Sequence, residues 1–169
     1  MSIYSQNMDD LKIAAAMFLL LWTIVLYRAG KKEAFQKPLK LLIVPLILLS
    51  LYGIFSHTVL GRTPSDSHVF TMMSSNTNEF YREMFMNALL YYPLGLFLSV
   101  LIGPWTILAG LVLSVGIEAW QYFAGTGLAQ GTDVLCNTLG AAIGVLPWLV
   151  SRWLQRLRRK NPPPDRTET

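Results

Sequence analysis

Two apolar stretches in the C-terminal half of the chain carry carboxylate and amide side chains that could do chemistry. Glu118 and Gln121 lie within the apolar run Trp105–Phe123, and Asp133 and Asn137 stand at the start of the next run. A carboxylate costs about 3 kcal/mol at the centre of a membrane helix, so such residues usually face the interior of a helix bundle and often serve a function. Glu118 and Asp133 are therefore the candidate acid and base of a reaction at this site.

Amide and guanidinium side chains near these carboxylates could hold a ligand in place. Amides orient a substrate through hydrogen bonds, and arginine binds phosphate or carboxylate groups in a bidentate geometry. The sequence offers five candidates for substrate contact: Arg62, Arg82, Asn87, Gln121 and Asn137.

The same residues could instead hold the helices together. Glu118 could be a buried acid that is neutral or paired with Arg62 or Arg82. Asp133 stands at an expected helix start, where its side chain could cap the first backbone N–H groups. Amides such as Asn137 could form hydrogen bonds between helices.

The composition indicates that much of the protein surface faces something other than water. The chain has 169 residues, of which 53% are hydrophobic and only 14% are charged, whereas soluble domains have about 25% charged residues. Five apolar runs come close to the ~20 residues that a membrane helix needs: Leu11–Tyr27, Leu39–Phe55, Met84–Ile102, Trp105–Phe123 and Val134–Val150. We predict an all-α, polytopic helical bundle in a membrane.

Basic residues indicate the orientation of this bundle. Eleven of the fourteen Lys and Arg residues lie either in the segment Arg28–Lys40 or after residue 151. With five spans both segments fall on one side, which the positive-inside rule makes cytoplasmic, and the N-terminus is outside. The candidate site residues then share the outer half of the bundle. Because the cations flank apolar runs, the net charge of +4 indicates a membrane and not a nucleic acid as partner.

We expect a single transmembrane domain, residues 11–151, between an outer tail of residues 1–10 and a basic, disordered cytoplasmic tail of residues 152–169. Small residues continue the faces of the candidate helices. Gly110 and Ser114 extend the face of Glu118, and Gly140 and Gly144 extend that of Asn137. Small residues at this spacing allow helices to approach closely, so the fifth run is expected to pack on the fourth.

Histidine and cysteine residues do not form a recognisable metal motif. His57 and His68 are not in an HxxxH or HExxH spacing. The single cysteine, Cys136, cannot form a disulfide within the chain, and we interpret it as a small packing residue. The sequence predicts no metal and no other cofactor.

Four features follow one another between roughly residues 51 and 150: Arg62, then "NALLYYPLGLF", "SVGIEAWQ" and "DVLCNTLGAAIG". In this order and spacing they resemble the VanZ-like membrane family. The resemblance implies a small multi-helix protein of the bacterial cytoplasmic membrane, and the founding member of that family is linked to teicoplanin resistance. Family members commonly carry an Arg and a further Asp just before the position of Asp133, where this chain reads "GTGLAQGT".

Two functions are compatible with these patterns. The first is an outward-facing site that binds or modifies a lipid-linked or anionic precursor of the cell envelope, in glycopeptide resistance or envelope homeostasis. The second is a non-catalytic membrane protein for assembly or partner binding, whose polar residues serve helix packing. The sequence does not decide between them, nor whether the protein is an enzyme, and it does not predict an oligomeric state.

Overall fold

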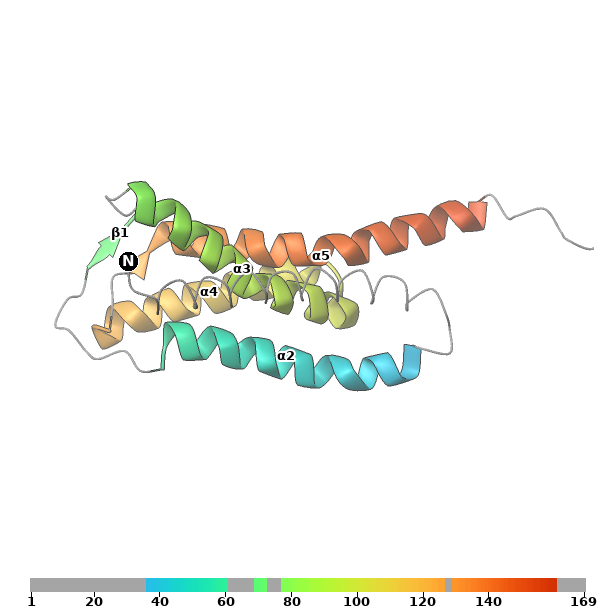
Figure 1. Ribbon diagram of the computed structural model, residues 1–169, viewed down its shortest axis with the longest axis horizontal. Helices are drawn as coiled ribbons and strands as arrows, with labels where there is room; N and C mark the ends of the chain where they lie inside the picture. Colours follow the sequence, from blue (N-terminus) through green and yellow to red (C-terminus); the bar gives the residue numbers. More distant parts are fainter. Residues whose placement is uncertain (1–35, 61–68, 73–76, 127–128, 161–169) are drawn as a thin grey trace, which may run out of the picture.

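The structure is a computed structural model that describes residues 36–60, 69–72, 77–126 and 129–160 (Figure 1). The predicted first span, Leu11–Tyr27, and the candidate Arg62 lie outside the described residues. The described part consists of four helices and two short strands: α2 (Gln36–Thr58), β1 (Phe70–Thr71), α3 (Thr77–Ile102), α4 (Trp105–Ala124), β2 (Ala129–Gln130) and α5 (Gly131–Lys160).

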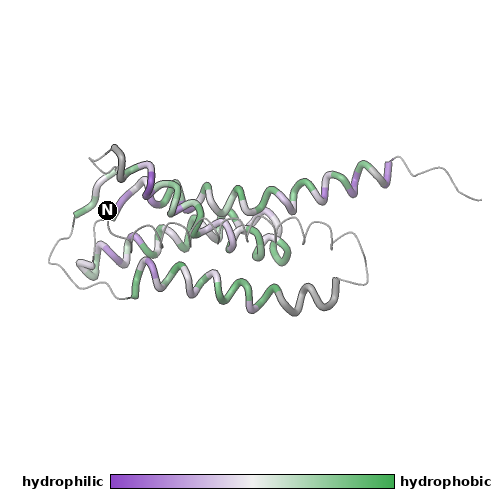
Figure 2. Tube along the Cα trace, viewed as in Figure 1, coloured by the Kyte–Doolittle hydropathy of each residue, from purple (hydrophilic) through white to green (hydrophobic). Residues whose placement is uncertain are grey.

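Three of these helices contain segments that are long and apolar enough to cross a membrane: Phe80–Ile102, Trp105–Ala124 and Gly131–Leu157. A shorter apolar segment, Ile43–Thr58, lies in α2. Figure 2 shows apolar residues along each helix and polar residues concentrated near the helix ends. For the described residues, the prediction of an all-α bundle is confirmed apart from the two-residue strands. The last three predicted spans are confirmed as helices of sufficient length.

Successive helices run in opposite directions along the bundle (Figure 1). At one end α2 and α4 finish and α3 and α5 begin, and the two strands lie there; we call it the strand end. At the other end Gly103 and Pro104 connect α3 to α4, and we call it the turn end. Gly103 adopts a positive φ of 62°, a conformation that favours glycine after a helix. The Thr106 hydroxyl donates a hydrogen bond to the Gly103 carbonyl at 2.8 Å and so stabilises this turn.

Close packing of α3 against α5 forms the centre of the bundle. A Cβ atom added at Gly140 would collide with the Ala88 backbone, including Cα at 2.7 Å, and one added at Gly144 would lie 2.6 Å from the Leu96 nitrogen. Conversely, a Cβ at Gly95 would lie 2.8 Å from the Ala141 Cα. The expected packing of α5 on α4 is present, but the part of this small-residue face that contains Gly140 and Gly144 lies elsewhere. It packs on α3, because α3 also presents small residues at the crossing.

A contact between α4 and α5 lies beside this crossing. A Cβ added at Gly110 of α4 would come within 2.8 Å of the Ala141 Cβ. Small residues therefore bring α4 as well as α3 close to α5, and side chains from the three helices can meet.

Two connections that are far apart in the sequence are joined by strand pairing at the strand end. β1 and β2 pair in parallel, with Phe70 opposite Ala129 and Thr71 opposite Gln130. Next to this pair, the Thr132 N–H donates to the Met72 carbonyl at 3.2 Å. The segment before α3 is thereby fixed to the segment before α5.

The helices extend beyond the apolar runs that predicted them, α3 and α5 the furthest. α3 begins at Thr77 and not at Met84, and α5 continues to Lys160. The expectation of disorder from residue 152 onward is thus wrong for residues 152–160, which are helical. Leu, Gln, Arg and Lys are strong helix formers, so a helix can continue after its apolar run has ended.

Candidate functional site

The Glu118 carboxylate lies inside the bundle, with only 7% of the residue exposed. Its Oε2 atom accepts a hydrogen bond of 2.8 Å from the backbone N–H of Gln130 in β2. The sequence suggested Arg62 or Arg82 as a possible partner, and the structure shows a backbone donor from the connection that precedes α5. Glu118 therefore links α4 to the strand pair.

Asn137 of α5 is 3% exposed and faces α4. Its Nδ2 atom donates a hydrogen bond of 2.8 Å to the Ser114 hydroxyl. Its Oδ1 atom is buried and has no hydrogen-bond partner in the part of the chain that the structure describes. The NH2 group of this buried amide therefore links α5 to α4, while its oxygen accepts no hydrogen bond from the described residues.

The Tyr91 hydroxyl of α3 is a second buried polar group in this region. It lies beside Ser114 and within range of an electrostatic interaction with Glu118. Among the described residues it makes no hydrogen bond of ordinary geometry, although the Ser114 hydroxyl is close enough to interact with it. Tyr91, Ser114, Glu118 and Asn137 thus bring polar groups from three helices together, and we call these four residues the polar cluster.

Gln121 is buried on α4 but points to another helix. Its Nε2 atom donates a hydrogen bond of 2.9 Å to the carbonyl oxygen of Thr58, the last residue of α2. The final carbonyl groups of a helix have no partner within the helix, so this bond both satisfies one of them and ties α2 to α4. The geometry gives Gln121 a structural contact outside the polar cluster.

The remaining candidates surround the strand end. Asn87 is partly buried on α3, one turn before Tyr91. Asp133 is partly buried in the first turn of α5, and Arg82 is exposed near the start of α3. Asp133 and Arg82 each have an interaction partner. The structure therefore unites Glu118 and Asn137 of the predicted residues, and it places Asn87, Asp133 and Arg82 at the same end of the bundle.

Tyr91 was missed by the sequence reasoning, although a signal was present. It follows Asn87 by four residues, so the two share one face of α3. It was not singled out from the sequence, because it lies within the apolar stretch "NALLYYPLGLF". Its hydroxyl group, which usually finds a partner when buried, is what makes it part of a site.

Metal-binding side chains do not gather in this region. Among the described residues, no group of three His, Cys, Asp or Glu side chains could hold a metal ion. Cys136 is buried beside Asn137 in the sequence, and its thiol is not in a disulfide. The chemistry available to the polar cluster is that of a carboxylate, two hydroxyls and an amide.

Apolar helices of membrane-spanning length, with a polar cluster enclosed between three of them, define the class of helical membrane proteins with an internal polar site. Within that class, the chain belongs to the VanZ/LLP1 family, whose model matches residues 13–152. No curated protein and no solved structure matches the chain. The family resemblance predicted from residues of the central and C-terminal parts is confirmed, and the match begins nearer to the N-terminus.

Proposed function

We propose that this protein binds the polar part of a lipid-linked or anionic precursor of the cell envelope at the polar cluster. Such binding would serve resistance to glycopeptides such as teicoplanin, or envelope homeostasis, at the outer face of a bacterial cytoplasmic membrane. The observation that carries the proposal is that two polar atoms of the cluster, the Tyr91 hydroxyl and Asn137 Oδ1, are buried without a hydrogen bond among the described residues. The third such atom, Thr126 Oγ1, lies outside the polar cluster.

The free-energy cost of burying a polar group without a hydrogen bond suggests that a ligand supplies the partner for these two atoms. A buried polar group without a hydrogen bond costs about 1–3 kcal/mol, and lipid offers no water to satisfy it. Tyr91 and Asn137 come from different helices and both lie beside Ser114. A hydroxyl group of a ligand could accept a hydrogen bond from the Tyr91 hydroxyl and donate one to Asn137 Oδ1, and so recover this energy at both groups. A ligand amide could likewise donate its N–H to Oδ1, whereas a phosphate oxygen could only accept from Tyr91.

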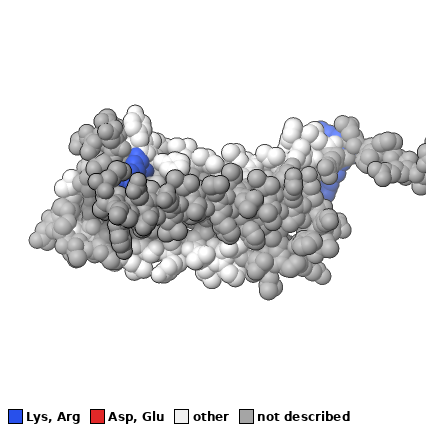
Figure 3. Space-filling view, viewed as in Figure 1, with Lys and Arg blue, Asp and Glu red and all other residues white. Residues whose placement is uncertain are grey.

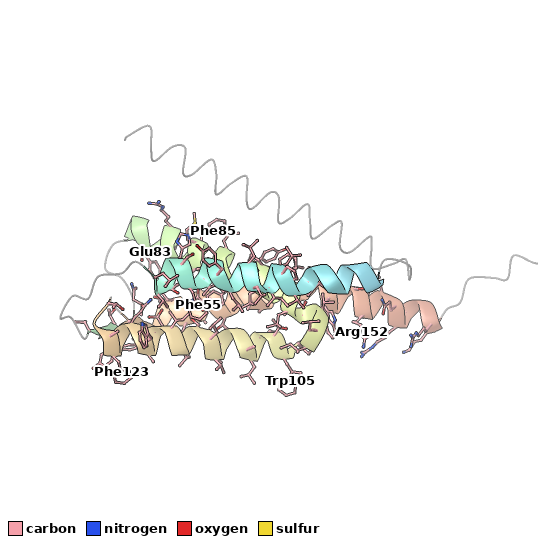
Figure 4. All side chains as sticks on the ribbon, turned by 90° about the horizontal axis from the view of Figure 1, so that it is seen from below. Phe55, Glu83, Phe85, Trp105, Phe123 and Arg152 are labelled. Carbon is pink, nitrogen blue, oxygen red and sulfur yellow. The ribbon has the colours of Figure 1, made fainter. Side chains whose placement is uncertain are left out.

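The surroundings of the cluster fit a ligand that has a polar head and a lipid tail. Arg82 lies exposed at the same end and offers a positive charge to an anionic group. Apolar side chains such as Phe85 and Phe123 are exposed near that end, where an acyl chain could lie against them (Figure 4). If the ligand is also modified, Glu118 or Asp133 would supply the acid or base.

A non-catalytic assembly protein is the alternative function, and specific contacts favour it. The hydrogen bonds of Glu118, Gln121 and Asn137 end on Gln130, Thr58 and Ser114, each in another element of the same chain. In this alternative the polar residues only align helices.

Removal of the Tyr91 hydroxyl should separate the two functions. We expect Tyr91→Phe to weaken binding of an undecaprenyl-diphosphate-linked muropeptide by roughly threefold to tenfold, the contribution of one hydrogen bond. The melting temperature should fall little, because among the described residues the hydroxyl makes no hydrogen bond of ordinary geometry that could be lost. Native mass spectrometry of purified full-length protein with increasing amounts of the muropeptide measures the binding.

The matched control for this experiment is Tyr52→Phe, since Tyr52 is 65% exposed on α2. It should bind like the wild type. A wild-type protein that does not bind the muropeptide, or a Tyr91→Phe protein that binds it unchanged, would contradict the proposed ligand contact and leave the assembly function as the better account.

Topology decides whether the polar cluster can meet an external precursor. In a Cys136→Ala background, we expect a cysteine at position 127 to react with a membrane-impermeant maleimide in intact cells. A cysteine at position 159 should react only after permeabilisation, because the basic end of α5 is expected to be cytoplasmic. The reverse pattern of labelling would place the strand end inside the cell and rule out the external site.

A further inference from the structure

The C-terminal part of α5 continues beyond the rest of the bundle at the turn end (Figure 1). Trp148 marks the level of the α3–α4 turn, because a Cβ atom added at Gly103 would lie 3.0 Å from the Trp148 ring. With a rise of 1.5 Å per residue, Lys160 lies about 18 Å further along the helix. A segment of three helical turns therefore projects past the point where α3 and α4 end.

Four cations lie on one side of this projecting segment: Arg152, Arg156, Arg159 and Lys160, all exposed. Their spacing of four, seven and eight residues from the first places them along one helix face. We call these residues the basic stripe. The space-filling view shows Lys and Arg of the described residues at both ends of the visible face (Figure 3).

Aromatic and aliphatic side chains lie next to the basic stripe. Trp153 is 59% exposed and Leu157 is 40% exposed, one helical turn apart. The Arg152 guanidinium carbon lies 5.5 Å from the centre of the Trp148 ring, a distance at which the cation is attracted to the ring face. Trp148 is itself held against the turn, so Arg152 is oriented by a fixed neighbour.

Acidic side chains do not balance this charge within the described residues. Glu83, Glu118 and Asp133 lie near the strand end, and α5 has no acidic residue after its first turn. A cationic and aromatic helix face, with no acidic residue of the described chain beside it, is complementary to a surface that is negatively charged and has an apolar layer beneath the charges.

We propose that the basic stripe, together with Trp148 and Trp153, binds the headgroups of anionic phospholipids at the turn end. Each headgroup layer of a bilayer is about 5–8 Å thick. Arg152 lies about 6 Å beyond Trp148 along the helix and reaches this layer. Lys160 lies about 18 Å beyond Trp148, in the water, and interacts with the headgroups only at a distance. Charges are screened over about 8 Å at physiological ionic strength, so the contribution should decline from Arg152 to Lys160.

Tryptophan quenching by brominated lipid tests this inference, because the chain provides a reporter and a control at the same end. Trp153 lies beside the basic stripe. Trp105 is 69% exposed at the start of α4, so it lies at the turn end but on another helix than the basic stripe (Figure 4). Two full-length proteins are prepared, and each keeps one of these tryptophans and has phenylalanine at the other four tryptophan positions. Both are reconstituted in vesicles of roughly 70% phosphatidylcholine and 30% phosphatidylglycerol, a mixture that represents an anionic membrane. The bromine is carried either by the phosphatidylglycerol or by an equal amount of the phosphatidylcholine.

The ratio of the two quenching efficiencies reports local enrichment of the anionic lipid. Attraction of one cation near an anionic surface corresponds to at most about fivefold enrichment, and for Trp153 we expect a ratio of about two or more. For Trp105 we expect a ratio near one. Arg152→Gln should lower the Trp153 ratio more than Lys160→Gln does, and the substitution of all four cations by glutamine should bring it to the Trp105 value.

Equal ratios for Trp153 and Trp105 in the two single-tryptophan proteins that keep all their cations would overturn the inference, and this comparison needs no charge substitution that could impair folding. A Trp153 ratio that survives neutralisation of the four cations would overturn it as well. The inference concerns the turn end and stands apart from the function proposed for the polar cluster at the other end.

Discussion

Substitution of Gly140 by alanine is expected to destabilise the protein by about 1–3 kcal/mol, the range for an added group in a well-packed interior. The new methyl group would collide with the backbone of Ala88, and a backbone cannot move aside as a flexible side chain can. Gly144→Ala should have a similar effect, because its methyl group would meet the backbone of Leu96 at 2.6 Å. Leucine at either position should prevent accumulation of the protein.

The chain contains a matched control for these substitutions. Gly116 is also inside a membrane helix, but a Cβ atom added there meets nothing within 4 Å. Gly116→Ala should be neutral or slightly stabilising, since alanine is favoured over glycine in a helix by up to about 1 kcal/mol. The free energy of unfolding, measured by titration with a denaturing detergent, and the protein level in the membrane give the comparison. Equal stability of Gly140→Ala and Gly116→Ala proteins would contradict close packing of α5 on α3.

Hydrophobic patterning was sufficient to locate the helices but not to define their ends. The runs Met84–Ile102 and Trp105–Phe123 are mostly apolar, and each forms a helix that begins or ends near the predicted residue. The polar segment before Met84 and the basic segment after residue 151 are helical as well. Their residues have adequate helix propensity, and apolar content alone does not report that property.

Helix partners were harder to predict than helices. The spacing of Gly140 and Gly144 correctly indicated a close approach, yet it contains no information about which helix approaches. The answer depends on α3, where Ala88 and Gly95 provide the complementary surface. A stripe of small residues on one helix therefore predicts that another helix packs closely against it. A matching stripe on a second helix is needed to predict which helix that is.

The candidate site illustrates the same limit. The cost of a carboxylate in an apolar run predicted that Glu118 avoids lipid, and the residue is indeed buried. Its bond to the Gln130 N–H could not be predicted, because a backbone donor becomes available only when the connection between α4 and α5 folds back as β2. Helix-face reasoning considers side chains and omits such backbone partners.

The strand pair gives Glu118 a role that is wider than a local contact. β2 pairs with β1, and Glu118 holds β2, so one carboxylate stabilises the connections before both α3 and α5. The same residue belongs to the polar cluster. A change at Glu118 can therefore act through folding or through ligand contact, and only variants that differ in one respect can separate these effects.

Glu118→Gln and Glu118→Leu are expected to differ strongly for this reason. Glutamine has the same shape and retains an oxygen that can accept the Gln130 N–H, so the free energy of unfolding should change by less than about 1 kcal/mol. Leucine cannot accept this hydrogen bond and leaves a backbone N–H without its partner. We expect Glu118→Leu to lose about 1–3 kcal/mol of stability, measured by the same detergent titration.

Glu118→Gln, which should leave stability nearly unchanged, should nevertheless impair function. If the negative charge or proton exchange of Glu118 serves the proposed site, Glu118→Gln should bind the muropeptide at least about tenfold more weakly, or fail to support teicoplanin resistance, at a normal protein level. Glu83→Gln is the matched control, because it makes the same chemical change at an exposed position of α3. A Glu118→Gln protein with full binding and full resistance, alongside an unstable Glu118→Leu protein, would reduce Glu118 to a residue that holds the strand pair in place.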